Sequence, residues 1–250
     1  MNTRIAFAYL QARCQARLSR RLDGDWERLA AVRDPGAYLA AVLRNPFHAT
    51  LSALQNLTGI HETEEQLRDS FRRIVNETAV WAPPAWRQAV RWTAVLADLP
   101  VFQFLRQDGD AYGWIRNDPH LQRLVTSPAA RQTLSREPRP LLTLLQSSPD
   151  SLLTLWVRHW RFLWPKPDAG TRDQLHRLEA VVLKSRRRLL DEHSLRSDGE
   201  AAVLESEFTR ILRRRIQTPA AAFAYLGLSW LELARLRAGL LERRLAARPA

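Results

Sequence analysis

Apolar residues recur at intervals of three and four along almost the whole chain, with polar residues between them. This spacing places apolar side chains on one face of an α-helix. We find no convincing run of apolar and polar alternation bounded by hairpin turns, the pattern that is typical of strands. The pattern therefore predicts an all-α fold.

Prolines and polar turn residues divide the first part of the chain into successive helices. Asp34 and Pro35 have the residue types of a helix N-cap and of a first helical position, and Asn45-Pro46 ends that helix. Pro83-Pro84 opens another helix, and Pro100 predicts a break before a helix at 101–106. These signals predict a series of short to medium helices.

The helix between these turns carries a recognisable start signal. Thr63 and Gln66 have the spacing of a capping box, which predicts a helix from there to Asn76. Opposite charges lie four residues apart in Glu64 with Arg68 and in Asp69 with Arg73. Such pairs are typical of a solvent-exposed helix face.

The chain changes character between residues 107 and 167, where prolines are frequent and helices are expected to be short. Trp156, Trp160 and Trp164 are spaced by four, so they form a ridge on one helix face. Such a ridge indicates a core or domain-contact face, or alternatively a platform on which nucleic-acid bases stack. Helices at 171–192 and 200–216 and a shorter region from 219 follow. We therefore divide the chain into an N-terminal helical subdomain (1–107), a Pro/Trp-rich middle segment (108–170) and a C-terminal helical region (171–250).

The charge of the chain favours acidic partners. The formal net charge is +12, and arginine supplies nearly all of the positive charge because the chain has only two lysines, Lys166 and Lys184. Cys14 is the single cysteine, so no internal disulfide can form. The longest charge-free and mostly apolar stretch has 15 residues, at 217–231, which is short of a membrane span. We expect a protein that is soluble or attached to a membrane from outside.

The residues needed for catalysis or metal binding are poorly represented. The sequence has no glycine-rich phosphate loop and no Gly-x-Ser-x-Gly turn, and its six histidines lack the paired spacing of a zinc motif. We therefore predict no active site of its own, no cofactor and no metal, while the fold could still bring distant residues together.

Two basic clusters lie in the last third of the chain, at 184–188 and 210–215. Consecutive charges on a helix point in most directions, so neither cluster gathers its charge on one narrow face of the helix. Three interpretations are open: a solvated basic face, a surface that docks onto an acidic protein or lipid, and a nucleic-acid contact.

The four residues FAYL occur near both ends of the chain, at 7–10 and again at 223–226. The first copy leads into Ala12-Arg13 and Arg17, and the triplet Asn45-Pro46-Phe47 follows after a polar joint. This order resembles the start of the central-stalk family of V-type and archaeal A-type rotary ATPases, whose members are called C in prokaryotes and d in eukaryotes.

The C-terminal end resembles the closing pattern of the same family. Tyr225-Leu226 is followed by Glu232, seven residues after the tyrosine, and then by Leu236-Arg237. The chain departs from the family where Ser229 replaces a lysine and Arg235 replaces an asparagine. Between the ends, Asp98 matches an aspartate of the family, whereas Val101 replaces its asparagine. The resemblance spans roughly the first 107 and the last 50 residues.

The resemblance implies a funnel-like array of up to three similar helical subdomains that does no chemistry. Such a protein receives rotor shaft subunits D and F, sits on the proteolipid ring at the cytoplasmic face of the membrane, and couples ATP hydrolysis to proton or sodium transport. A basic surface would suit nearby anionic lipid headgroups. Nucleic acid is not an expected partner under this interpretation. The alternative is a basic all-helical adaptor or nucleic-acid-binding module unrelated to rotary ATPases.

Candidate partner-binding residues lie on the first and last helices and in one basic cluster. They are Arg13, Arg17, Glu232, Arg235, Arg237, Arg186, Arg187 and Arg188. The alternative for Arg13, Arg17 and Glu232 is a set of internal ion pairs that hold the two ends together. Tyr9 and Tyr225 are expected to pack at the edge of the core.

Overall fold

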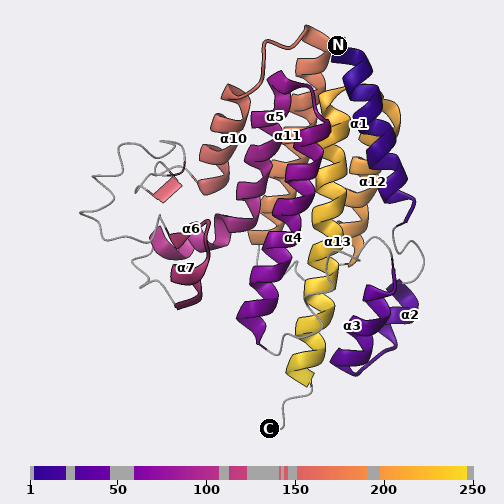
Figure 1. Ribbon diagram of the computed structural model, residues 1–250, viewed down its shortest axis with the longest axis vertical. Coiled ribbons are helices and arrows are strands. Elements are labelled where there is room, and N and C mark those ends of the chain that lie inside the picture. Colours follow the sequence, from indigo (N-terminus) through magenta and orange to yellow (C-terminus); the bar gives the residue numbers. More distant parts are fainter. Residues whose placement is uncertain are drawn as a thin grey trace.

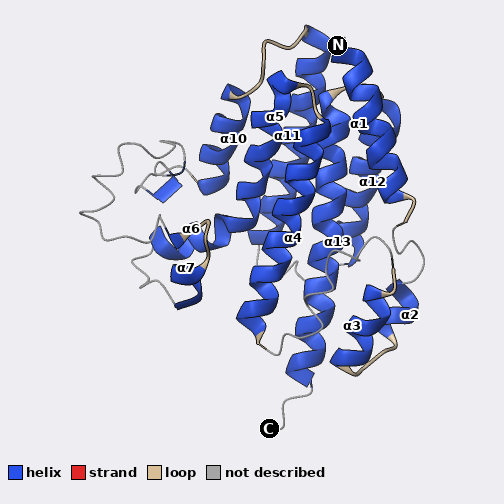
Figure 2. Ribbon diagram, viewed as in Figure 1, coloured by secondary structure: helices blue, strands red, loops and turns tan. Residues whose placement is uncertain are grey.

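The computed structural model describes residues 3–20, 26–45, 59–106, 113–122, 141, 144–145, 151–190 and 198–246. The helices of these residues are α1 (Thr3–Leu18), α2 (Trp26–Ala30), α3 (Pro35–Leu43), α4 (Ile60–Trp81), α5 (Arg87–Trp92), α6 (Leu99–Arg106), α7 (Gly113–Asn117), α10 (Leu152–Phe162), α11 (Ala169–Leu190), α12 (Asp198–Arg214) and α13 (Pro219–Ala246), with 3-10 helices η2 (Pro84–Trp86) and η3 (Thr93–Asp98). The described part contains helices and loops without a strand (Figure 2). The predicted all-α class is confirmed.

The long helices α4 and α13 lie side by side in the middle of the structure (Figure 1). α13 also packs against α1, α3, α11 and α12, while α10 packs against α5 and α6. Described residues from all three predicted segments contribute to one hydrophobic core. The funnel-like arrangement of subdomains stays a prediction. In the described part of the chain, no helix is both long enough and apolar enough to cross a membrane.

Of two helix starts predicted from the sequence, that of α3 is confirmed and that of α4 is not. Asp34 caps α3 as expected, because its carboxylate accepts a hydrogen bond of 2.7 Å from the backbone N–H of Ala37. The predicted start of α4 is wrong: Gly59 is the N-cap, and the Glu62 carboxylate accepts a bond from its N–H. Thr63 lies inside the helix, where its hydroxyl donates to the Gly59 carbonyl at 2.9 Å. The helix also continues past Asn76 to Trp81.

Two other predicted boundaries are wrong. Pro100 lies in the first turn of α6, where a missing N–H is tolerated, so it does not precede the helix. The region from Pro219 is the longest described helix, with 28 residues, rather than a shorter one. α13 continues through two glycines, and each lies where another side chain approaches the helix closely. A Cβ atom at Gly227 would meet the Phe208 ring at 2.8 Å, and one at Gly239 would meet Cζ of Tyr38 at 2.7 Å.

We expect Gly239→Ala to lower the free energy of unfolding by about 1 to 2 kcal/mol, because the buried Tyr38 ring must move away. The better helix propensity of alanine offsets part of this loss. Gly170→Ala is the control, since its Cβ would meet only Asp168 Oδ1, at 3.4 Å, near the exposed start of α11. Urea unfolding followed by circular dichroism measures both. Equal stability of the two variants would contradict the close contact.

The tryptophan ridge belongs mainly to the core. Trp156 and Trp160 are 3% and 2% exposed, and Trp164 is half-buried. Trp156 and Trp92 exchange hydrogen bonds, since each indole N–H donates to the other residue's carbonyl, at 3.2 and 3.1 Å. These bonds join α10 to α5. The core interpretation is therefore confirmed for Trp156 and Trp160.

The two helices that carry FAYL lie side by side, but their tyrosines differ. Tyr225 is buried as expected, whereas Tyr9 is 52% exposed, so the expected packing of Tyr9 is wrong. The buried Gln11 side chain connects the two ends: it donates to the Leu212 carbonyl at 3.2 Å and accepts from the Gln217 N–H at 2.6 Å. Gln217 has a positive φ of 58° in the turn between α12 and α13. The two hydrogen bonds of Gln11 therefore fix α1 to the turn between α12 and α13.

Candidate partner-binding site

Three arginines, two in α1 and one just after its C-terminal end, lie beside the last residue of α4. Arg13, Arg17 and Arg20 are spaced by four and three residues, which places them on one side of the helical path. Together with Ala16 and Trp81 they line a surface hollow of about 230 Å³. We call these three arginines and Trp81 the α1 arginine cluster.

The cluster combines positive charge with an aromatic surface. The guanidinium carbons of Arg13 and Arg17 lie 5.2 and 5.6 Å from the ring centre of Trp81, within the range of a cation–π interaction. Arg13 also lies 5.6 Å from the ring centre of Tyr9. Arg17 forms an ion pair of 2.5 Å with Glu77 of α4, which balances one of the charges. In the described part of the chain Arg13 has no carboxylate partner, so it can receive an acidic group from outside.

The three candidate residues of α13 lie elsewhere and make contacts within the protein. Glu232 is 0% exposed, so its side chain does not reach the surface. Arg235 forms an ion pair of 2.6 Å with Glu205 of α12, and Arg237 pairs with Glu64 of α4. These two ion pairs join α13 to its neighbours. The structure therefore separates the α1 arginines from the charges of α13, of which Arg237 is also exposed, at 53% of its side chain.

The third group of candidates lies near the end of α11. Arg186, Arg187 and Arg188 belong to that helix, but their side chains lie outside the described residues. The residues Pro46 and Phe47 of the family-like triplet also lie outside them.

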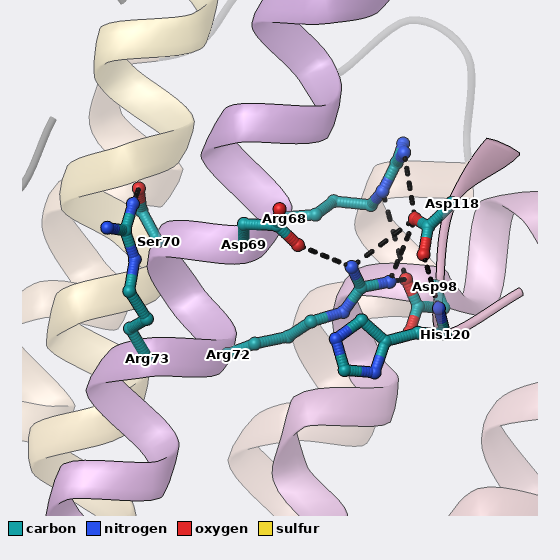
Figure 3. A network of polar contacts seen from close by, with 8 residues as sticks. All are labelled: Arg68, Asp69, Ser70, Arg72, Arg73, Asp98, Asp118 and His120. Carbon is teal, nitrogen blue, oxygen red and sulfur yellow. Dashed lines mark hydrogen bonds and ion pairs between the residues drawn. The ribbon is translucent and has the colours of Figure 1, made fainter. Parts of the chain in front are cut away.

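A buried ion cluster, which the sequence interpretation missed, lies on another part of α4 (Figure 3). Arg68 and Arg72 of α4 meet Asp98 of η3 and Asp118, which follows α7. Arg72 binds Asp98 at 2.6 Å and Asp118 at 3.3 Å, and it also binds Asp69 at 2.7 Å. We call Arg68, Arg72, Asp98 and Asp118 the buried ion cluster.

The four charges of the buried ion cluster balance one another. Arg68 lies 3.8 Å from Asp98 and 3.5 Å from Asp118, and its guanidinium carbon lies 4.7 Å from the ring centre of Trp114. Burial raises the pKa of Asp98 to about 6, against the opposite effect of Arg72 and Arg68. Asp118 also accepts a bond of 2.8 Å from the His120 N–H, which closes the turn after α7. The cluster connects three segments that are distant in sequence.

The predicted exposed face of α4 is therefore wrong at Arg68, which is 7% exposed. Its predicted partner Glu64 pairs with Arg237 instead, and Asp69 pairs with Arg72 rather than Arg73. One sequence signal could have indicated this arrangement. Arg68 and Arg72 each directly follow an apolar core residue, Leu67 or Phe71, so they lie at the border of the apolar face.

The described residues of these sites offer different chemical groups. Among the residues that the structure describes, no group of three or more His, Cys, Asp or Glu side chains could hold a metal ion. Burial raises the pKa of the Cys14 thiol well above its usual range, so this cysteine stays protonated. The α1 arginine cluster is an accessible charged site, and it suits carboxylate or phosphate groups.

Comparisons with known proteins found no matching family model, no matching curated protein and no matching solved structure.

Proposed function

We propose that the chain is a non-catalytic central-stalk adaptor of a V/A-type rotary ATPase, which couples the rotor shaft to the membrane proteolipid ring. One observation carries the proposal. The two sequence segments that resemble the family lie at opposite ends of the chain, yet α1 and α13 pack side by side in one body. The family-like residues thus belong to one local structure.

Some residues of that local structure are buried and others are exposed, and we assign them different roles. Gln11 and Tyr225 are buried between the helices, and Glu232 is fully buried in α13. These residues maintain the shape of the joint between the two ends. Arg13 is accessible on the outer side of α1, beside the hollow at Trp81. It supplies the contact with an acidic segment of a partner.

The mechanical task fits the helical architecture. α4 and α13 have 22 and 28 residues and contact each other. Near one end, Arg237 forms an ion pair with Glu64, and Arg244 donates a hydrogen bond to the Thr63 hydroxyl. In the proposed role, these two packed helices would act together as one element that transmits torque. The proposed partners are shaft subunits D and F and the proteolipid ring, at the cytoplasmic face of the membrane, with anionic headgroups nearby.

Charge reversal in the α1 arginine cluster tests the proposal. In cells that express the tagged full-length chain, Arg13→Glu/Arg17→Glu is expected to reduce co-purified shaft and ring subunits by about tenfold or more, because acidic partners would be repelled. ATP-driven ion transport by the membranes should fall in parallel. The matched control is Arg172→Glu/Arg177→Glu, which reverses two exposed charges on α11.

The outcomes separate the alternatives. If the unmodified chain co-purifies with no ATPase component, the proposed function is wrong. If the chain is instead retained on nucleic acid with strong salt dependence, the basic-adaptor alternative is favoured. Circular dichroism of the variant must match that of the unmodified chain, since loss of Arg17 also removes the ion pair with Glu77.

A further inference from the structure

A large apolar cavity that is open to solvent lies between the helices, away from the α1 arginine cluster. Its volume is about 370 Å³, which falls in the range of small-molecule pockets. Helices α4, α6, α10, α11, α12 and α13 and the 3-10 helix η3 contribute to its wall. Its aromatic side chains are Phe71, Trp156, Trp160, Phe208, Phe223 and Trp230. The wall is therefore suited to an apolar or aromatic molecule.

The one carboxylate among the described residues of the wall is already compensated. Glu179 is 4% exposed and accepts two hydrogen bonds from Arg161, of which the bond from Nε is 2.6 Å long. His176 Nδ1 lies 3.3 Å from the same carboxylate. A positively charged ligand would lose its hydration, and the Glu179 carboxylate would not compensate it because Arg161 already binds that carboxylate. The wall thus favours an uncharged molecule.

One polar group of the wall lacks a partner. Trp160 is 2% exposed, and its indole Nε1 has no hydrogen-bond partner in the described part of the protein. The neighbouring Trp156 differs, because its Nε1 donates to the Trp92 carbonyl. The Nε1 atom itself is covered by neighbouring side chains, so a ligand in the cavity meets the apolar ring of Trp160 rather than its N–H.

We propose that this cavity binds an uncharged, largely apolar small molecule through the aromatic and aliphatic side chains of its wall. The site is independent of the rotary-ATPase proposal, since it uses none of the residues of the α1 arginine cluster.

Two neutral fluorescent probes test the site with the purified full chain. Prodan is an apolar naphthalene with a carbonyl acceptor, and N-phenyl-1-naphthylamine has a similar size but no carbonyl. Both are expected to bind saturably at one site per chain. Leu204→Trp adds bulk at a lining position and should weaken both probes about tenfold or more, because the added indole occupies the cavity. Absence of saturable binding to the unmodified chain overturns the proposal.

The adjacent residue supplies a matched control. Val203→Trp places the same indole one position earlier on α12, at a side chain that is 53% exposed, and should leave both affinities unchanged. If Leu204→Trp does not fold, Gln103→Trp replaces it, since Gln103 lines the cavity but is exposed. A folded blocking variant that binds the probes like the unmodified chain overturns the assignment of the cavity.

Discussion

Arg72→Ala is expected to lower the free energy of unfolding by about 3 to 5 kcal/mol, the range for a buried ion pair that loses one partner. Arg72 is 5% exposed and binds both Asp98 and Asp118. Its removal leaves two buried carboxylates with Arg68 alone. Urea unfolding monitored by circular dichroism measures the effect.

Two further variants make this expectation specific. Arg73→Ala is the control on the same helix: Arg73 is exposed, lies on the other side of α4 and binds Ser70, so its loss should cost less than about 0.5 kcal/mol (Figure 3). Arg72→Met/Asp98→Leu removes one charge of each sign and should be more stable than Arg72→Ala. The role of the buried ion cluster would be disproved by equal stability of Arg72→Ala and Arg73→Ala.

The loss caused by Arg72→Ala should also depend on pH. Burial already raises the pKa of Asp98 to about 6, and removal of Arg72 takes away a charge that opposes this rise. A carboxyl whose pKa is higher in the folded protein than in the unfolded chain destabilises the fold as pH rises through that interval. The deficit of the variant should therefore be smaller near about pH 5 than near about pH 8.

Arg243→Ala is expected to release α2 and α3 from α13, with a loss of about 3 kcal/mol in the stability of that contact. Arg243 lies in the last turn of α13 and is 8% exposed. It donates hydrogen bonds to the carbonyls of Leu29, Ala30 and Val32, and its guanidinium carbon lies 4.0 Å from the ring centre of Tyr38. Without it, three carbonyls at the end of α2 lose a charged donor.

Hydrogen exchange resolves this effect along the chain. Amides of residues 26–43 should exchange faster in Arg243→Ala, by about 100-fold if the contact loses nearly 3 kcal/mol, while those of α4 change little. Arg237→Ala is the matched control because Arg237 is also on α13 but has a side chain that is 53% exposed and an ion pair with Glu64. An exposed pair of this kind contributes about 1 kcal/mol or less. Faster exchange spread equally over all helices would argue against a local docking role.

Local sequence signals predicted many of the helices because their causes lie within a few residues. Asp34 and Pro35 define the start of α3 through the carboxylate and the fixed φ angle of proline. The start of α4 was missed because glycine is a less distinctive N-cap than threonine, and the wrong residue had the expected spacing. The glycines of α13 gave no sign of the rings that approach them, since Phe208 and Tyr38 come from other helices.

The candidate site was predictable only in part, for the same reason. The resemblance drew attention to both terminal helices, and these helices do lie side by side. It did not distinguish the accessible Arg13 from the buried Glu232, because helical periodicity says which residues share a face but not what covers that face. The apolar cavity could not be predicted at all, since six α-helices and the 3-10 helix η3 supply its wall.

The sequence by itself determined the helical class, the excess of positive charge and the repeat of FAYL near both ends, because periodicity, composition and short motifs are properties of the chain. Only the tertiary structure decided which charges are buried. Arg72 meets Asp98 and Asp118 from positions 26 and 46 residues away. Such contacts depend on how whole helices pack, and packing brings together side chains that no local pattern relates.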